Sequence, residues 1–142
     1  MRTVNQLLQS KGFDIVTIDS DASVFDALTL MADKGIGSLV VLDKDQTVGL
    51  FTERDYARDI ALQGRTAKET RVAQIMTSHV AVAKPNQTIQ ECMAVMTEKR
   101  VRHLPVIEDG ELLGIISIGD LVKAIIEDQQ FVIEQLVSYI NA

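Results

Sequence analysis

The sequence contains one unit twice, and this internal repeat constrains the fold more than any other feature. Residues 15–60 align with residues 80–125 without a gap, at a constant offset of 65 positions. Many aligned pairs are conservative, such as Thr52 with Ser117. The identical pairs are Met31/Met96, Lys34/Lys99, Leu39/Leu104, Val41/Val106, Gly49/Gly114, Asp55/Asp120 and Ile60/Ile125. We therefore expect two copies of one supersecondary unit.

Each copy has the pattern of a β-α-β-β-α unit. Capping boxes at the starts of helices, apolar stripes at helical spacing and a valine-rich run at 38–43 indicate the elements. In the first copy we predict strands at 15–18, 38–43 and 48–51, and helices from 24 and from 53 to about 62. In the second we predict strands at 80–83, 103–107 and 112–116, and helices at 88–99 and from 118 to about 140. A short helix at 2–10 and a helical turn around 72–76 complete the prediction.

Such a unit leaves one face of its small sheet uncovered, so two units packed sheet to sheet would bury a shared core. The predicted class is α+β, with two tandem β-α-β-β-α repeats related by a pseudo-twofold axis. The predicted boundaries are an N-terminal helix over 1–12, a first domain over 13–66, a linker over 67–78, a second domain over 79–130 and an extension of the last helix over 131–142.

Composition narrows the classes of function. A net charge of −6, from 14 basic and 20 acidic residues, argues against a dedicated nucleic-acid binder. The apolar runs are too short to span a membrane, and residues 1–10 do not resemble a secretory leader. The single cysteine, Cys92, aligns with Ala27 on a buried helix face, so we expect a core residue rather than a disulfide, a zinc ligand or a nucleophile. These features predict a cytoplasmic protein.

Two heptapeptides occupy matched positions, Gly49–Asp55 and Gly114–Asp120. Each has a glycine in a strand, then a hydroxyl residue, then an aspartate three residues later at the start of a helix. One interpretation is purely structural, because Ser/Thr-x-x-Asp is a helix capping box. The other is functional: the first-turn N–H groups and the hydroxyl could hold a phosphate, the aspartate could accept hydrogen bonds from a ribose, and the glycine would let a ligand approach. The residues alone leave both interpretations open.

Two tandem units that each carry G-h-h-[ST]-x-x-D, with h an apolar residue, resemble a pair of CBS domains, the Bateman module. The resemblance covers about residues 13–130. The stretches FTERDYAR (51–58) and VRHLPVIEDGELLGIISIGDLV (101–122) are similar to stand-alone CBS-pair proteins of bacteria and plant organelles. This resemblance implies a regulatory domain that binds an adenosine ligand.

The resemblance also implies a role for individual residues. Thr52 and Asp55 would contact ribose and phosphate in one cleft, and Ser117 and Asp120 in the other. A basic residue at the start of the second strand commonly reaches the phosphate; the second repeat has Arg102 and His103 there, whereas the first has Gly37 and Ser38, with Arg54 as a partial substitute. The apolar positions Val80 and Ala81, with the strand at 104–107, would sandwich an adenine beside Asp120, and Gly114 completes the predicted binding set.

We therefore expect a non-catalytic sensor of adenine nucleotides that regulates a partner in trans when ligand binding biases the packing of the repeats. AMP is the favoured ligand, because a single phosphate suits one Arg-His pair; ATP, NAD(H) and S-adenosylmethionine stay open. The alternatives are a constitutive scaffold with vestigial clefts and, third, a small enzyme. A Ser117–His103–Asp120 triad is disfavoured, because Ser117 and Asp120 are local neighbours and the aspartate is badly placed to orient the histidine.

The last predicted helix is more apolar than one intramolecular contact requires. Its apolar stripe consists of Leu121, Ile125, Phe131, Ile133, Leu136, Val137 and Ile140. This excess, together with the association of similar CBS pairs into discs of four repeats, predicts a homodimer.

Overall fold

A computed structural model describes residues 2–141. The chain forms two compact units: one consists of residues 15–80, and the other combines the N-terminal segment up to Asp14 with the chain from Ala81 onward. The first repeat thus lies within one unit. The second repeat shares its unit with the N-terminal helix, which the repeat pattern did not anticipate. The predicted domain boundaries themselves stay a prediction.

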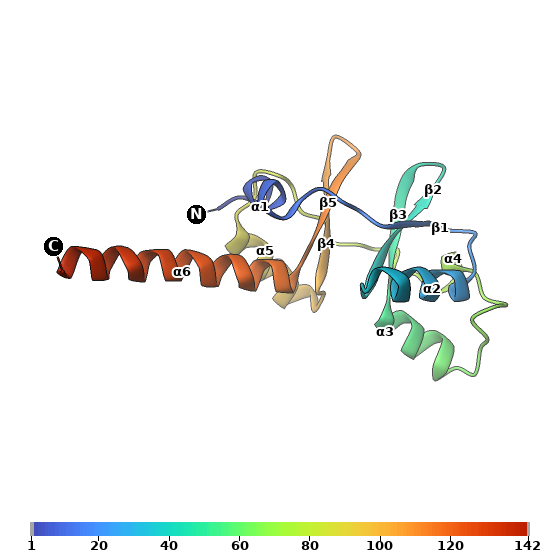
Figure 1. Ribbon diagram of the computed structural model, residues 1–142. Helices are drawn as coiled ribbons and strands as arrows, with labels where there is room; N and C mark the ends of the chain where they lie inside the picture. The colour runs from blue at the N-terminus through green and yellow to red at the C-terminus, as the bar shows by residue number, and fades with distance from the viewer. Residues whose placement is uncertain (1, 142) are drawn as a thin grey trace. The chain divides into compact units, whose positions relative to one another are not determined.

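The unit of residues 15–80 is built on a three-stranded sheet (Figure 1). Its strands are β1 (Thr17–Asp19), β2 (Ser38–Asp43) and β3 (Gln46–Thr52), in the order β1-β2-β3, with β1 parallel and β3 antiparallel to β2. Its helices are α2 (Val24–Lys34), α3 (Glu53–Tyr56), the π-helical turn η1 (Ala57–Ala61) and α4 (Val72–Ile75). The predicted helix from 53 to 62 is therefore a short α-helix that continues as a π-turn.

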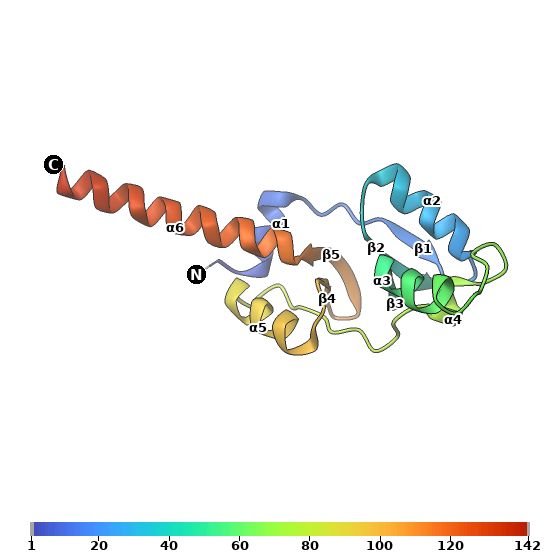
Figure 2. The ribbon, with the colours of Figure 1, turned by 90° about the horizontal axis from the view of Figure 1, so that it is seen from below.

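The other unit is built on the antiparallel pair β4 (His103–Glu108) and β5 (Glu111–Ser117). Its helices are α1 (Val4–Lys11), α5 (Ile89–Lys99) and α6 (Ile118–Ile140). The strand predicted at 80–83 is reduced to one parallel bridge, between Ala83 and Val106. α6 extends well beyond the sheet of its own unit (Figures 1 and 2). The α+β class with two small sheets is confirmed.

Both hairpin turns take the two-residue form in which both residues have positive φ. Lys44 and Asp45 join β2 to β3, and Asp109 and Gly110 join β4 to β5. These turns set the register that places Ser38 opposite Thr52 and His103 opposite Ser117. The hairpin geometry therefore brings the start of one strand beside the heptapeptide at the end of the next.

Each unit has its own apolar core. Leu39, Val41 and Phe51 are fully buried in one, and Leu104, Val106 and Ile116 in the other. Helix α1 adds to the second core Val4, Leu7 and Leu8, which are at most 4% exposed. Cys92 also lies in this core and is 1% exposed, as predicted. Among residues 2–141, no helix is long and apolar enough to cross a membrane.

Candidate functional site

The second heptapeptide leads from β5 into α6 and forms a reciprocal capping box. The Ser117 Oγ accepts a hydrogen bond from the Asp120 N–H at 3.1 Å, and the Asp120 Oδ2 accepts one from the Ser117 N–H at 2.9 Å. The structural interpretation of the motif is therefore confirmed. It does not exclude the functional one, because a carboxylate accepts about four hydrogen bonds and a hydroxyl both donates and accepts.

The register of the β4–β5 pair places the basic dipeptide beside this cap. His103 lies opposite Ser117, and the Ile118 N–H donates to the Arg102 carbonyl at 2.8 Å. Arg102 is exposed and His103 is half-buried. The structure thus gathers Arg102, His103, Ser117 and Asp120, four of the predicted site residues, at the N-terminus of a helix of 23 residues.

Lys11 also belongs to this site, and the sequence analysis missed it. Its Nζ donates to the Asp120 Oδ2 at 2.8 Å and to the Ile115 carbonyl at 2.7 Å. The Lys11 and Asp120 side chains are 29% and 25% exposed. Partial burial raises the pKa of Asp120, but the hydrogen bonds from Lys11 and Ser117 outweigh it, so the pKa lies below its ordinary value. Asp120 is therefore a carboxylate at neutral pH.

Gly114 is covered by protein in this structure. A Cβ at Gly114 would lie 2.8 Å from the Leu8 Cδ2, so helix α1 uses the space that the missing side chain leaves. At the matching position of the first repeat, a Cβ at Gly49 would lie 2.6 Å from the Thr77 carbonyl oxygen. Both glycines allow a covering segment to pack against the strand, and a role for Gly114 in ligand approach stays a prediction.

The first heptapeptide forms the same cap but is more enclosed. The Asp55 Oδ2 accepts hydrogen bonds from the Thr52 N–H at 2.9 Å and from the Thr52 Oγ1 at 3.1 Å. The Asp55 Oδ1 accepts one from the Thr77 Oγ1 at 3.2 Å. Asp55 is 8% exposed, so its carboxylate is less accessible than that of Asp120. The helix that it caps, α3, has only four residues before the π-turn.

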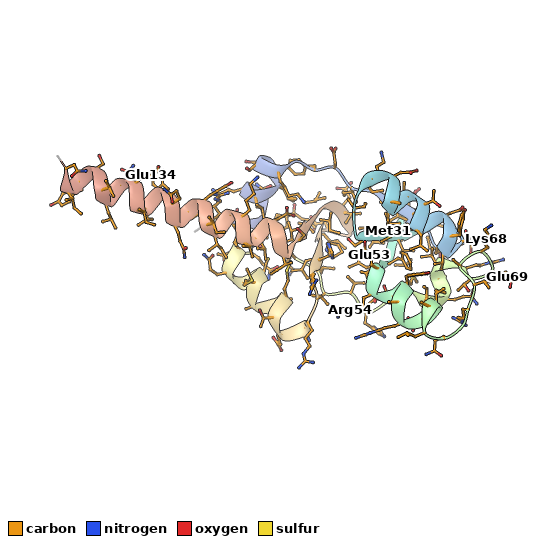
Figure 3. The ribbon with its side chains drawn as sticks, turned by 60° about the horizontal axis from the view of Figure 1, so that its bottom comes forward. Met31, Glu53, Arg54, Lys68, Glu69 and Glu134 are labelled. Atoms are coloured by element: carbon orange, nitrogen blue, oxygen red, sulfur yellow. The ribbon has the colours of Figure 1, made fainter. Side chains whose placement is uncertain are left out.

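The charges beside the first heptapeptide also differ from those beside the second. Ser38 is buried opposite Thr52, and the Glu53 N–H donates to the Gly37 carbonyl at 3.2 Å. A Cβ at Gly37 would lie 3.6 Å from the Glu53 carboxyl group. In the second repeat, Arg102 aligns with Gly37 and Ile118 aligns with Glu53. Figure 3 labels Glu53 and the exposed Arg54 in the first turn of α3. An acidic group therefore lies where the second repeat has a base.

The two predicted adenine-contacting residues fall in different units. Val80 ends the unit that contains Asp55, whereas Ala81 begins the part of the chain that packs with Asp120. Ala81 is half-buried against the core of β4 and β5. In the first unit, Thr77 shows that the segment leading into the second repeat approaches Asp55. The assignment of both Val80 and Ala81 to the Asp120 site stays a prediction.

Other parts of the described chain offer weaker sites. A hollow of about 620 Å³ lies at the turn end of the β4–β5 pair, lined by residues that include Lys84, Glu108 and Asp109, and it contains none of the predicted site residues. Within residues 2–141, no group of three His, Cys, Asp or Glu side chains could hold a metal ion. Burial raises the pKa of the Cys92 thiol to about 11, which does not favour a thiolate nucleophile.

Comparison with known proteins places the whole chain in one family. Residues 8–62 and 72–127 each match the model of the CBS domain. The mitochondrial CBS domain-containing protein CBSX3 of Arabidopsis thaliana is 35% identical over 148 residues, covering 98% of this chain and 72% of the relative. A solved structure from Burkholderia ambifaria, described as a candidate signal-transduction protein with CBS domains, is 53% identical with a TM-score of 0.87, covering 90% of this chain and 96% of the other.

A more distant structure shares the fold. The CBS domain pair of protein MJ0100, described in complex with 5′-methylthioadenosine and S-adenosylmethionine, is 21% identical with a TM-score of 0.79. The alignment covers 90% of this chain and 98% of that one. At this identity the likeness establishes the fold and not the ligand.

Proposed function

The chain belongs to the CBS-domain family as a tandem pair, and from that premise we propose that it senses an adenosine nucleotide, with AMP favoured, and regulates a partner protein in trans without catalysing a reaction. One observation carries the proposal. Arg102, His103, Ser117 and Asp120 converge at the N-terminus of α6, with Asp120 held as a carboxylate.

The chemistry of this site suits a ribose 5′-phosphate. The Ile118 and Asp120 N–H groups already donate to the Arg102 carbonyl and the Ser117 Oγ. The positive end of the α6 dipole and the Ser117 hydroxyl still favour an anion, and Arg102 can add a charge-assisted hydrogen bond. The Asp120 carboxylate can accept hydrogen bonds from the two ribose hydroxyls. The proposed site therefore combines a hydrogen-bond acceptor suited to a ribose with cations suited to a phosphate, and a single phosphate suits one Arg-His pair. ATP, NAD(H) and S-adenosylmethionine are the alternative ligands.

The second heptapeptide is the main site in this proposal. The first has Glu53 near Gly37 in place of a base, and its aspartate is buried with both oxygens already accepting hydrogen bonds. A phosphate at the first site would meet an acidic group. We infer that Thr52, Arg54, Asp55 and Ser38 form a weaker site at most.

A thermal-shift panel tests the proposal against its alternatives. AMP at 100 times its dissociation constant should stabilise the protein by about 2.7 kcal/mol, and ADP, ATP, NADH and S-adenosylmethionine are ranked beside it. A scaffold with vestigial clefts would respond to none of them and would carry no copurified nucleotide absorbing near 260 nm, where a chain with no Trp and 2 Tyr absorbs little. Turnover of the bound ligand would instead favour the enzyme alternative.

We also propose that the chain forms a homodimer through α6. From residue 129 to residue 140 every side chain of this helix is exposed, including those of Ile133, Leu136 and Ile140. Two residues of the predicted apolar stripe do not belong to this surface, because Leu121 is fully buried and Ile125 half-buried in the core of their own unit. The exposed Val122 and Ile126 take their place; with the three residues above they follow the spacing of a coiled-coil seam and are each at least 43% exposed. A second copy of α6 has the matching surface. The regulated partner and the predicted cytoplasmic location stay predictions, and the plant relative is described as mitochondrial.

A further inference from the structure

The hydrogen bonds at Asp120 limit how a ribose can bind there. Each carboxylate oxygen accepts about two hydrogen bonds. The Asp120 Oδ2 already accepts two, from the Ser117 N–H at 2.9 Å and from the Lys11 Nζ at 2.8 Å. A ribose whose two hydroxyls each bind one carboxylate oxygen needs an acceptor position on Oδ2. In this two-oxygen geometry, one of the two present donors must therefore leave.

The two donors differ in how readily they can move. The Ser117 N–H is a backbone group held in the cap of α6. The Lys11 ammonium is at the end of a flexible side chain that is 29% exposed. Water can therefore solvate this ammonium group when it leaves the Asp120 carboxylate. On this basis we propose that Lys11 is a displaceable counter-ion of Asp120: a bound ribose displaces it, and its release reports that the site is occupied. This inference rests on the proposed function and deepens it.

The position of Lys11 in the chain gives the displacement a consequence. Lys11 is the last residue of α1, and Gly12, with φ of 107°, follows it. Residues 12–16 are in neither helix nor strand, and after Asp14 the chain passes into the other unit. Loss of the Lys11–Asp120 ion pair would therefore loosen the segment that connects the two units.

The remainder of α1 would stay in place. Leu8 is buried against Gly114, and Arg2 forms ion pairs with Glu127 at 3.1 Å and Asp128 at 2.9 Å on α6. The release is thus confined to the C-terminal end of α1 and the connecting segment.

The first repeat has a related contact, but its donor is a neutral hydroxyl and its acceptor is the other carboxylate oxygen. The Thr77 Oγ1 donates to the Asp55 Oδ1 at 3.2 Å, and Thr77 lies in the segment that leads into the second repeat. At the offset of 65 positions Thr77 matches Gly12, the neighbour of Lys11. In each repeat, the segment leading into one copy donates a hydrogen bond to the heptapeptide aspartate of the other. The position of the contact thus recurs in both copies, whereas the cation is present in the second repeat and not in this contact of the first.

Adenosine is the probe that tests displacement, because it has the ribose but no phosphate that Lys11 could attract. Calorimetry should show adenosine binding about threefold more tightly to Lys11→Met than to the parent, since the ribose no longer competes with an ion pair. Lys11→Arg, which keeps the cation, should bind like the parent. Lys84→Met, which removes an exposed lysine elsewhere in the unit, should also leave the affinity unchanged.

Hydrogen exchange supplies the second measurement. Adenosine should speed exchange of the Gly12 amide, which donates to the Leu8 carbonyl at 2.7 Å, in the parent protein. In Lys11→Met, exchange should be fast before ligand is added and should not change afterwards. Equal or weaker binding of adenosine to Lys11→Met, or slower exchange on binding to the parent, would overturn the inference.

The two proposals fail in different ways. If AMP and adenosine bind the parent and lose affinity in Asp120→Ala, the proposed function stands, whatever Lys11→Met shows. If neither ligand binds the parent, both the proposed function and the role of Lys11 are overturned.

Discussion

At the scale of single residues, two aspartates with the same local motif differ in their long-range partners. Asp120 pairs with the Lys11 cation, and Asp55 with the neutral Thr77 hydroxyl. The motif predicted both caps, because a capping box depends on residues three apart. It could not predict Lys11, which lies 109 residues from Asp120 and has no local sequence signal. The capping box was therefore predictable from the sequence, whereas the positively charged partner of Asp120 was not.

The Lys11–Asp120 ion pair should make stability depend on pH. The pKa of Asp120 is lower in the folded protein than its ordinary value of about 3.9, so the stabilisation is complete above about pH 4 and is lost as the pH falls through the folded-state pKa. Lys11→Met should lower the free energy of unfolding by up to about 1 kcal/mol at pH 7. Urea denaturation should show this difference shrinking toward the lowest pH at which the parent still folds. A difference that does not change with pH would contradict the account.

The two matched glycines should differ in their tolerance of a methyl group. At Gly49 the nearest atom to a new Cβ is a backbone oxygen at 2.6 Å, which cannot move aside easily; at Gly114 it is the end of the Leu8 side chain at 2.8 Å, which can. Gly49→Ala should lower the free energy of unfolding by about 1–3 kcal/mol, and Gly114→Ala by less. Chemical denaturation of the pair measures both values, and the reverse order would show that the packing is misassigned.

At the scale of elements, periodicity and capping predicted most helices and strands. β2 at Ser38–Asp43 and α6 at Ile118–Ile140 have the predicted bounds, because a valine-rich run and a capped apolar stripe are strong local signals. The strand predicted at 80–83 forms only one bridge, and the helix from 53 continues as a π-turn. The single bridge depends on pairing of Ala83 with the distant Val106. The capping box at Thr52 marks where a helix begins and not how its hydrogen bonds continue, so the π-turn was not predicted either.

Helix α1 was predicted as an element, and its position on the second repeat was not. Leu8 is 1% exposed within that core, so Leu8→Ala should destabilise the protein by about 2–4 kcal/mol through the cavity that it leaves. Leu62→Ala is the matched control, because Leu62 is 80% exposed and should lose almost nothing. Equal effects of the two substitutions on the unfolding midpoint in urea would mean that α1 does not stabilise this unit.

The exposed part of α6 should control self-association. Ile133→Glu and Leu136→Glu, at side chains that are 52% and 57% exposed, should convert the proposed dimer to monomer without lowering the melting temperature of the monomer. Gln135→Glu, which adds the same charge on the helix face away from the seam, should leave the dimer intact, as should charge reversal at Glu134, labelled in Figure 3. Sedimentation at micromolar concentration measures the result, and a parent protein that is already monomeric would refute the dimer.

At the scale of the whole molecule, the repeat predicted the α+β class, and the paired heptapeptides within it pointed to the family. The division into units adds that the N-terminal segment packs with the second repeat, while the segment after the first repeat packs with the first. Each heptapeptide therefore contacts a segment from outside its own repeat. Leu8 and Lys11 contact the second heptapeptide, and Met76 and Thr77 contact the first. Alignment of the repeats cannot reveal this, because it compares the copies and not their contacts.

Titration calorimetry of AMP tests the central claim, that the second heptapeptide is the main nucleotide site. Asp120→Ala should weaken AMP binding at least tenfold, about 1.4 kcal/mol, and Asp55→Ala should weaken it less. Each substitution also removes a capping residue that contributes about 1 kcal/mol to stability, so binding is measured well below the melting temperature of each variant. An Asp120→Ala protein that binds AMP as tightly as the parent, or an affinity lost only in Asp55→Ala, would contradict the claim.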